Sequence, residues 1–261
     1  MISRMSTKNI VLFGETGAGK SSVVNLMAGR EVAKTSPDME RCTLHWKEHL
    51  IAFDGHQYKV FDTVGLEEPQ LGMREYLEII ENAYNLITKL QNEGGIDLLL
   101  FCVRAGRVTA TLQTNYRLFY EWLCESRVPI VLVLTGLERE NNMEDWWDRN
   151  ARVFDQYGIK VDGHACITAA NRLDGRHKDL YALSQTLVRD LVIEHTSGQR
   201  SVPFDDGFFH RFIRALKELI RGNRPPKKRD VVAILTKRCG MPPEAAKKLA
   251  QNIGKKGEEG S

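Results

Sequence analysis

The chain has 261 residues, of which 42% are hydrophobic and 27% charged, and its formal net charge is +3. This composition is typical of a soluble globular protein that buries a sizeable core. A charge of +3 is too small to indicate a nucleic-acid partner. The longest apolar runs, 98–103 and 130–134, are strand-sized and far short of the ~20 residues that span a membrane.

Cysteine usage and the N-terminal residues bear on the compartment. The five cysteines are Cys42, Cys102, Cys124, Cys166 and Cys239. Their odd number and the lack of a C-x-x-C motif favour reduced thiols over a disulfide framework. Residues 1–6 lack the apolar segment of a signal peptide, and Ile2 stands where N-myristoylation requires glycine. We therefore expect a cytoplasmic protein.

Strand-like and helix-like segments alternate from residue 8 to residue 197. The predicted strands are 10–13, 44–53, 58–61, 98–103, 129–134 and 164–168. The predicted helices are 22–28, 73–90, 109–125, 143–157 and 178–194. Asp54-Gly55 is a hairpin turn signal, so one edge strand is expected to be antiparallel. The pattern predicts an α/β fold with a mostly parallel six-stranded sheet between two helical layers. In the last helix, Leu180, Leu183, Leu187 and Leu191 are expected to lie on one face.

The composition changes after residue 197, which predicts a boundary. We divide the chain into an N-terminal tail (1–7), a main domain (8–197), a helical extension (198–253) and a disordered tail (254–261). Helix 204–221 combines an apolar stripe with basic residues. It is expected to pack on the main domain, to contact a partner or second subunit, or, less favoured, to lie on a membrane surface.

One motif points to a bound phosphate. It reads G-x-x-x-x-G-K-[ST] and comprises Gly14, Glu15, Thr16, Gly17, Ala18, Gly19, Lys20 and Ser21. The glycines let backbone N–H groups wrap an anion at a helix N-terminus. Lys20 would reach the β- and γ-phosphates, Ser21 would hold Mg²⁺, and Ser22 would extend the nucleotide contact.

A second motif, Asp62-Thr63-Val64-Gly65, follows a predicted strand. The carboxylate of Asp62 is expected to hold Mg²⁺ through water, and the N–H of Gly65 to contact a γ-phosphate. The Mg²⁺ shell also needs a hydroxyl from the intervening loop. Thr43 is the favoured candidate and Thr35 the alternative.

With these motifs the chain resembles the TRAFAC-class GTPases, in particular the septin-like branch of immunity-associated and chloroplast import-receptor GTPases. Its look-alikes there are fungal G-domain proteins. Residues 104–109 are similar to the segment that precedes the third helix in immunity-associated GTPases. The resemblance covers residues 8 to about 195. It implies a P-loop NTPase G domain that binds GTP or GDP with Mg²⁺ and self-associates in a nucleotide-dependent way.

The base-recognition motif departs from the family pattern. Ordinary GTPases read guanine with N/T-K-x-D after the fifth strand, whereas this chain has Thr135-Gly136-Leu137-Glu138. Glu138 is the candidate carboxylate for the guanine N–H groups, and Gly136 replaces the lysine that packs on the base. Thr168-Ala169-Ala170 resembles the final base-backing loop, with Ala169 as the contact. Guanine is the expected base and ATP the alternative ligand.

The residues expected to support hydrolysis also depart from the family pattern. Leu66 occupies the position where Ras-like enzymes use a glutamine to orient the attacking water. Glu67 and Glu68 are candidates for that role or simply part of a solvated loop. Arg104 and Arg107 are candidates for charge-stabilising arginines in a dimer, or form surface salt bridges.

The leading hypothesis is therefore a guanine-nucleotide switch whose Mg²⁺-dependent GTP hydrolysis, with Lys20, Thr43 and Gly65 at the γ-phosphate, is slow without a partner or dimer. The alternatives are a non-catalytic scaffold assembled by bound nucleotide and an ATP-binding P-loop NTPase. A small-molecule kinase is disfavoured because no arginine-rich lid is evident. Zinc-type Cys/His spacing is absent from the sequence, so no catalytic metal other than Mg²⁺ is expected.

Overall fold

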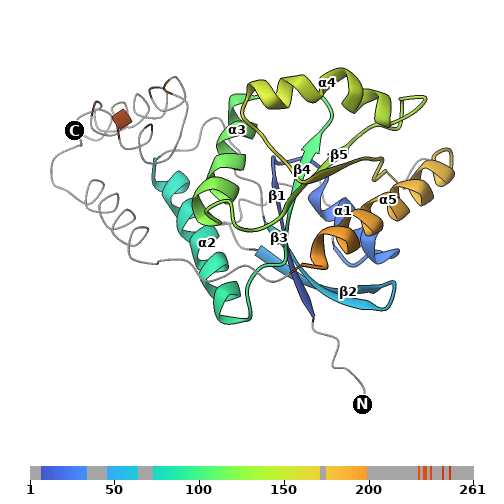
Figure 1. Cartoon of the computed structure of the whole chain (residues 1–261), viewed down its shortest axis with the longest axis horizontal. Coiled ribbons are helices and arrows are strands. Elements are labelled where there is room, and N and C mark those ends of the chain that lie inside the picture. The colour runs from blue at the N-terminus through green and yellow to red at the C-terminus, as the bar shows by residue number, and fades with distance from the viewer. Residues whose placement is uncertain are drawn as a thin grey trace, which may run out of the picture.

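The computed structural model describes residues 7–33, 46–63, 73–170 and 175–198, together with isolated positions between 229 and 247. Most of the predicted C-terminal extension lies outside these ranges, so its boundaries stay predictions. The described residues form one six-stranded sheet in the order β2-β3-β1-β4-β5-β6, with helices on both faces (Figure 1).

The elements alternate as the sequence predicts. The strands are β1 (Lys8–Gly14), β2 (Trp46–Phe53), β3 (His56–Thr63), β4 (Leu98–Arg104), β5 (Ile130–Thr135) and β6 (Gly163–Cys166). The helices are α1 (Lys20–Ala28), α2 (Met73–Asn92), α3 (Ala110–Tyr116), a π-helical continuation (Arg117–Leu123), α4 (Glu144–Gln156) and α5 (Lys178–Thr196). Among the described residues, no helix is long and apolar enough to cross a membrane.

The antiparallel edge predicted from Asp54-Gly55 is confirmed. β2 pairs antiparallel with β3, whereas every other neighbouring pair in the sheet is parallel. The hairpin closes on Asp54 and Gly55, whose φ angles are 47° and 78°. Positive φ at both central residues is the geometry of a type I′ turn, whose twist matches the flanking strands.

Alternating side chains of the central strands pack into two hydrophobic layers. Val11 and Phe13 of β1 face α2 and α3, whereas Ile10 and Leu12 face α1 and α5. Phe13 stacks on Phe101 at 4.7 Å between ring centroids. Because the central strands are buried on both faces, they read as continuous apolar runs rather than alternating ones.

The four leucines that share one face of α5 differ in burial, and the core is formed largely by the valines beside them. Leu183 and Leu187 are 51% and 37% exposed, whereas Val188 and Val192 are fully buried. Polar contacts with α1 account for this orientation. Arg189 donates two hydrogen bonds to the carbonyl oxygen of Met27, at 2.8 and 2.9 Å. These bonds satisfy a backbone carbonyl at the C-terminal end of α1 and turn the β-branched side chains of α5 toward the sheet.

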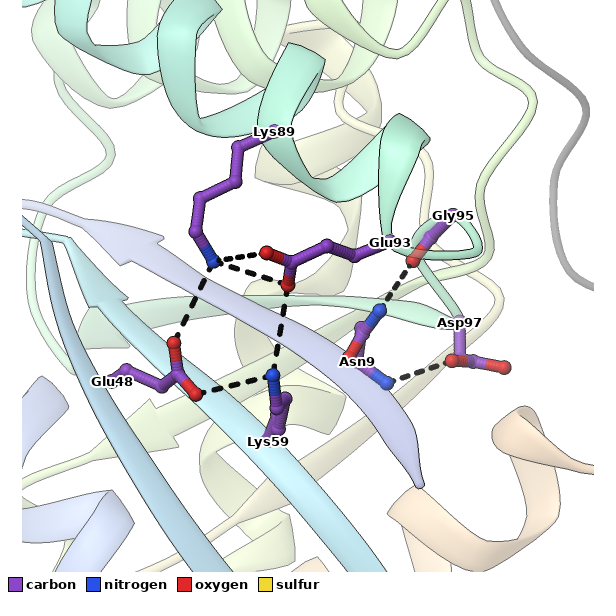
Figure 2. Close-up of polar contacts among 7 residues, drawn as sticks. All are labelled: Asn9, Glu48, Lys59, Lys89, Glu93, Gly95 and Asp97. Carbon is purple, nitrogen blue, oxygen red and sulfur yellow. Dashed lines mark hydrogen bonds and ion pairs between the residues drawn. The ribbon is translucent and has the colours of Figure 1, made fainter. Parts of the chain in front are cut away.

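The C-terminal end of α2 is fastened to the sheet by a charge network, which Figure 2 shows. Lys89 of α2 pairs with Glu93 at 2.9 Å and with Glu48 of β2 at 3.6 Å. Lys59 of β3 pairs with the same two carboxylates. All four side chains are 31–38% exposed, so each pair contributes little by itself. Together they set the position of α2 over the β2–β3 hairpin.

Close by, Asn9 joins β1 to the turn that leads into β4 (Figure 2). Its backbone N–H donates to the Asp97 carboxylate at 2.7 Å, and its side-chain amide donates to the carbonyl of Gly95 at 2.8 Å. Asp97 is 5% exposed and also pairs with Lys8 at 3.3 Å. These bonds hold the beginning of β1, whose opposite end carries the phosphate-binding motif.

Candidate functional site

The turn between β1 and α1 has a backbone that requires glycine. Gly14, Gly17 and Gly19 have φ angles of 142°, 79° and 86°. A Cβ atom on Gly14 would lie 2.0 Å from the carbonyl oxygen of Cys102 on β4. Any side chain at residue 14 would therefore force β1 and β4 apart. The structure forms the loop and helix start that the motif predicts.

Lys20 lies inside this loop, with only 8% of its surface exposed. Its ammonium donates to the carbonyl oxygens of Gly14 and Glu15, both at 2.9 Å. Burial lowers the pKa of Lys20, and the carboxylate of Asp62 opposes this shift. A cation with so little water around it is a strong attractor for an anion at the loop.

Ser21 and Asp62 come together although 41 residues separate them. The Ser21 hydroxyl donates to an Asp62 carboxylate oxygen at 2.7 Å. Asp62 reaches this position because β3 runs parallel to β1, with Asp62 opposite Leu12. Burial raises the pKa of Asp62, while the Ser21 bond and the Lys20 charge act in the opposite direction. A hydroxyl and a carboxylate held together are hard oxygen donors that suit Mg²⁺.

Several predicted residues cannot be placed. Thr43 and its alternative Thr35, as well as Gly65, Leu66, Glu67 and Glu68, lie outside the described residues. Their assigned roles stay predictions.

Thr135, at the end of β5, contacts the backbone of the phosphate-binding loop. Its hydroxyl donates to the carbonyl of Ala18 at 2.8 Å, and a Cβ atom on Gly19 would meet the Thr135 side chain at 3.5 Å. Next to it, Gly136 adopts a φ of 83°. The Arg104 side chain lies over this glycine, since a Cβ on Gly136 would be 3.5 Å from the Arg104 Cγ atom.

The two loops predicted to hold the base meet beside the phosphate-binding loop. The N–H of Leu137 donates to the carbonyl of Ile167 at 3.3 Å. The hydroxyl of Thr168 donates to the Glu138 carboxylate at 3.4 Å. Ala169 follows directly and is partly exposed. The structure thus brings Glu138 and Ala169 to one side of the site.

One contact of the loop was missed by the sequence analysis. The Thr109 hydroxyl donates to the Glu15 carboxylate at 2.6 Å and accepts from the N–H of Leu112 at 3.1 Å, which caps α3. The capping role follows from threonine before a helix. The pairing with Glu15 joins residues 94 positions apart, and no spacing rule reveals it.

These features define a class. A phosphate-binding loop after the first strand, an aspartate at the end of the parallel third strand and an antiparallel edge strand make up the G domain of a P-loop GTPase. Residues 9–136 match the family model described as "50S ribosome-binding GTPase". Over residues 9–136 the chain is therefore similar to GTP-binding G domains.

Relatives agree with this assignment. The chain is 27% identical over 229 residues to "Immune-associated nucleotide-binding protein 7" of Arabidopsis thaliana, covering 84% of this chain and 70% of that protein. It is 24% identical over 200 residues to "GTPase Der" of Campylobacter curvus, which covers 76% of this chain but only 38% of that protein. The predicted resemblance to immunity-associated GTPases is confirmed.

A solved structure confirms the fold. The structure of the chloroplast translocon components atToc33 and psToc159 aligns with a TM-score of 0.54 at 20% identity. The alignment covers 77% of this chain and 87% of that one. The likeness supports the predicted G-domain architecture of the described residues.

The first prediction concerns the buried carboxylate. Asp62→Asn keeps an acceptor for Ser21 but removes a charge whose pKa burial raises above 3.8. Nucleotide-free wild-type protein bears the cost of that charge at neutral pH, and the cost disappears as pH falls through the raised pKa. We expect the variant to be more stable by on the order of 1 kcal/mol near neutral pH, and the difference to vanish toward pH 3.8.

Urea unfolding in chelator across this pH range measures the difference. Asp190→Asn, which changes an exposed aspartate of α5, serves as the matched control and should show no such pH dependence. A less stable Asp62→Asn protein at neutral pH would contradict the prediction.

Proposed function

We propose that this protein is a guanine-nucleotide switch that binds GTP or GDP with Mg²⁺ and hydrolyses GTP slowly as a single subunit. One observation carries the proposal: the desolvated Lys20 ammonium lies in the phosphate-binding loop beside the Ser21–Asp62 pair. This arrangement supplies a cation for phosphate oxygens and oxygen donors for a hard metal ion within one small site.

In this proposal, the loop N–H groups and Lys20 hold the β- and γ-phosphates, and Ser22 adds a contact at the start of α1. Ser21 would coordinate Mg²⁺ directly and Asp62 through water, with Thr43 completing the shell from the preceding loop. When bound, Mg²⁺ neutralises charge on the phosphate oxygens. Gly65 would sense the γ-phosphate three residues after Asp62, at the start of the segment that leads to α2.

Hydrolysis is the attack of an in-line water on the γ-phosphorus, with breakage of the bond to the β-phosphate oxygen and release of GDP and phosphate. Leu66 has no group that orients this water. We therefore expect the missing group to come from a second subunit or a partner. Dimerization is important for the GTPase activity of the chloroplast translocon components with the same fold, which supports a nucleotide-dependent homodimer here.

Base preference rests on Glu138. Its carboxylate lies beside Thr168 and next to the loop that carries Ala169, and in this proposal it accepts from the N1 and N2 groups of guanine. Adenine offers no such pair of donors, so the carboxylate favours GTP over ATP. Three described cysteines, Cys102, Cys124 and Cys166, are buried thiols, which is consistent with the proposed cytoplasmic location.

Lys20→Ala tests nucleotide binding. Loss of the buried cation removes the main charge contact with the phosphates, so we expect affinity for GTP and GDP to fall by about a hundredfold or more. Competition of GTP, GDP, ATP and ADP against a fluorescent guanine nucleotide, with and without Mg²⁺, measures this. Lys160→Ala, which alters an exposed lysine before β6, is the control. Unchanged binding by Lys20→Ala would refute the proposed site.

Glu138→Gln tests base recognition while keeping the size of the side chain. We expect affinity for GTP to drop by about tenfold or more while affinity for ATP changes little, because an amide repels one of the two guanine donors. The same competition assay gives both values. Glu140→Gln, two residues on and paired with Arg149 at 2.8 Å, is the control. Equal losses for the two nucleotides would show that Glu138 does not read the base.

Single-turnover GTP hydrolysis against protein concentration tests the dimer. If a second subunit completes the site, the observed rate rises as dimers form, and removing Arg104 and Arg107 (both exposed) lowers the rate at high concentration without changing GTP affinity. Arg127→Ala, at an exposed ion pair with Glu125, is the control. A rate independent of concentration would refute assembly-dependent catalysis. Absence of turnover at every concentration would favour the non-catalytic scaffold.

A further inference from the structure

Three side chains with metal-ligating atoms, none of them part of the Ser21–Asp62 pair, meet where α4 begins beside β6. They are Glu144 in the first turn of α4 and His164 and Cys166 on β6. His164 and Cys166 are two residues apart on a strand and therefore face the same side of the sheet. Their ligand atoms and a Glu144 carboxylate oxygen all lie within 4.8 Å of one another.

The donor set is specific in its chemistry. It offers one imidazole nitrogen, one sulfur and one carboxylate oxygen, a mixture that suits Zn²⁺ and its neighbours rather than Mg²⁺ or Ca²⁺. In a tetrahedral zinc site, bond lengths of about 2.0–2.3 Å put neighbouring ligand atoms about 3.5 Å apart. Side-chain rotations of Glu144 and His164, which already contact each other, would bring the three atoms to that separation.

The surroundings hold two of the ligands in place. Trp147 stacks on the His164 ring with 4.3 Å between centroids and 24° between planes, which fixes the direction of the imidazole. The backbone N–H of Trp147, in the first turn of α4, donates to the sulfur of Cys166. Burial and the neighbouring Glu144 carboxylate outweigh this contact and raise the pKa of Cys166 to about 12, so the sulfur loses its proton only when a metal ion replaces it.

The three side chains differ in solvent exposure, and the more exposed ones leave a path for an ion from solvent. The Cys166 side chain is buried, whereas the side chains of His164 and Glu144 are 27% and 46% exposed. The ion would enter from the solvent side, and water would supply the fourth ligand.

We propose that Glu144, His164 and Cys166 bind a divalent transition-metal ion of the zinc class. On binding, the ion forms bonds to an imidazole nitrogen, a carboxylate oxygen and the sulfur, and the thiol proton leaves to solvent. The alternative is that His164 and Glu144 form a hydrogen-bonded pair beside a buried structural thiol. Only the metal site contains a bond between a cation and the sulfur, and this bond distinguishes the two explanations.

The site stands apart from the proposed nucleotide chemistry but close to the base loops. Cys166 precedes Thr168 by two residues, and Glu144 follows Glu138 by six. A bound ion would join the start of α4 to the end of β6. It needs no nucleotide, so its test does not depend on the proposed GTPase.

Cobalt(II) titration of the full chain, stripped with chelator and free of nucleotide, tests the proposal. Thiolate ligation gives an intense sulfur-to-cobalt absorption band in the near ultraviolet, whereas cobalt on oxygen ligands such as Ser21 and Asp62 gives none. We expect this band at one equivalent of cobalt, and we expect Zn²⁺ to abolish it by displacement. Absence of the band in the wild-type chain would overturn the proposal.

Variants assign the ligands. Cys166→Ser should abolish the band, and His164→Ala and Glu144→Gln should each weaken cobalt binding by about tenfold or more. Cys124→Ser, at a buried cysteine that lies outside the cluster, should leave the titration unchanged, as should Cys42→Ser and Cys239→Ser. A band that survives Cys166→Ser, or that is lost with Cys42 or Cys239, would refute this site. Circular dichroism confirms that each variant is folded.

Discussion

A lysine ammonium held almost out of water is the constraint on which the rest of this domain depends. Lys20 is 8% exposed and has two backbone carbonyls as partners. Keeping a charge in such a place is costly unless dipoles and opposite charges surround it. The sharp loop that presents the carbonyls exists only because Gly14 lets β1 approach the backbone of β4 at Cys102. Asp62 on the neighbouring strand offsets only part of the cost of burying Lys20, because burial of its own carboxylate outweighs its attraction to the lysine.

Three further hydrogen bonds connect the phosphate-binding loop and the start of α1 to other elements of the sheet. Thr135 binds the loop backbone from the end of β5, and Thr109 binds Glu15 from the start of α3. Ser21 binds Asp62 at the end of β3. Each contact begins at the C-terminal end of a parallel strand or the loop after it, where ligand sites of open α/β sheets form. A change in the ligand bound by the loop would therefore alter contacts at the C-terminal ends of β3, β4 and β5.

Whether a contact could be predicted from the sequence depends on how far apart its residues lie along the chain. The phosphate-binding loop is local, so its residue pattern predicted its form, and the hairpin at Asp54-Gly55 was predicted for the same reason. The meeting of Ser21 and Asp62 followed from placing two motifs at the ends of strands in one parallel sheet. By contrast, the buried face of α5 depended on Arg189 reaching α1, and a count of leucines could not show that. The Thr109–Glu15 bond and the Glu144–His164–Cys166 cluster likewise require the tertiary fold.

The loops predicted to hold the base depart more from the family pattern than the phosphate-binding loop does. The lysine that usually packs on the base is absent, and the Arg104 side chain lies over Gly136 in its neighbourhood. The two base loops are tied to each other by long hydrogen bonds of 3.3 and 3.4 Å, weaker than the 2.7–2.9 Å bonds around Lys20 and Ser21. Weak ties leave the position of Glu138 dependent on α4 and β6, the elements that frame it. A metal ion joining Glu144 to His164 and Cys166 would act at that point, fixing the elements from which both base loops emerge.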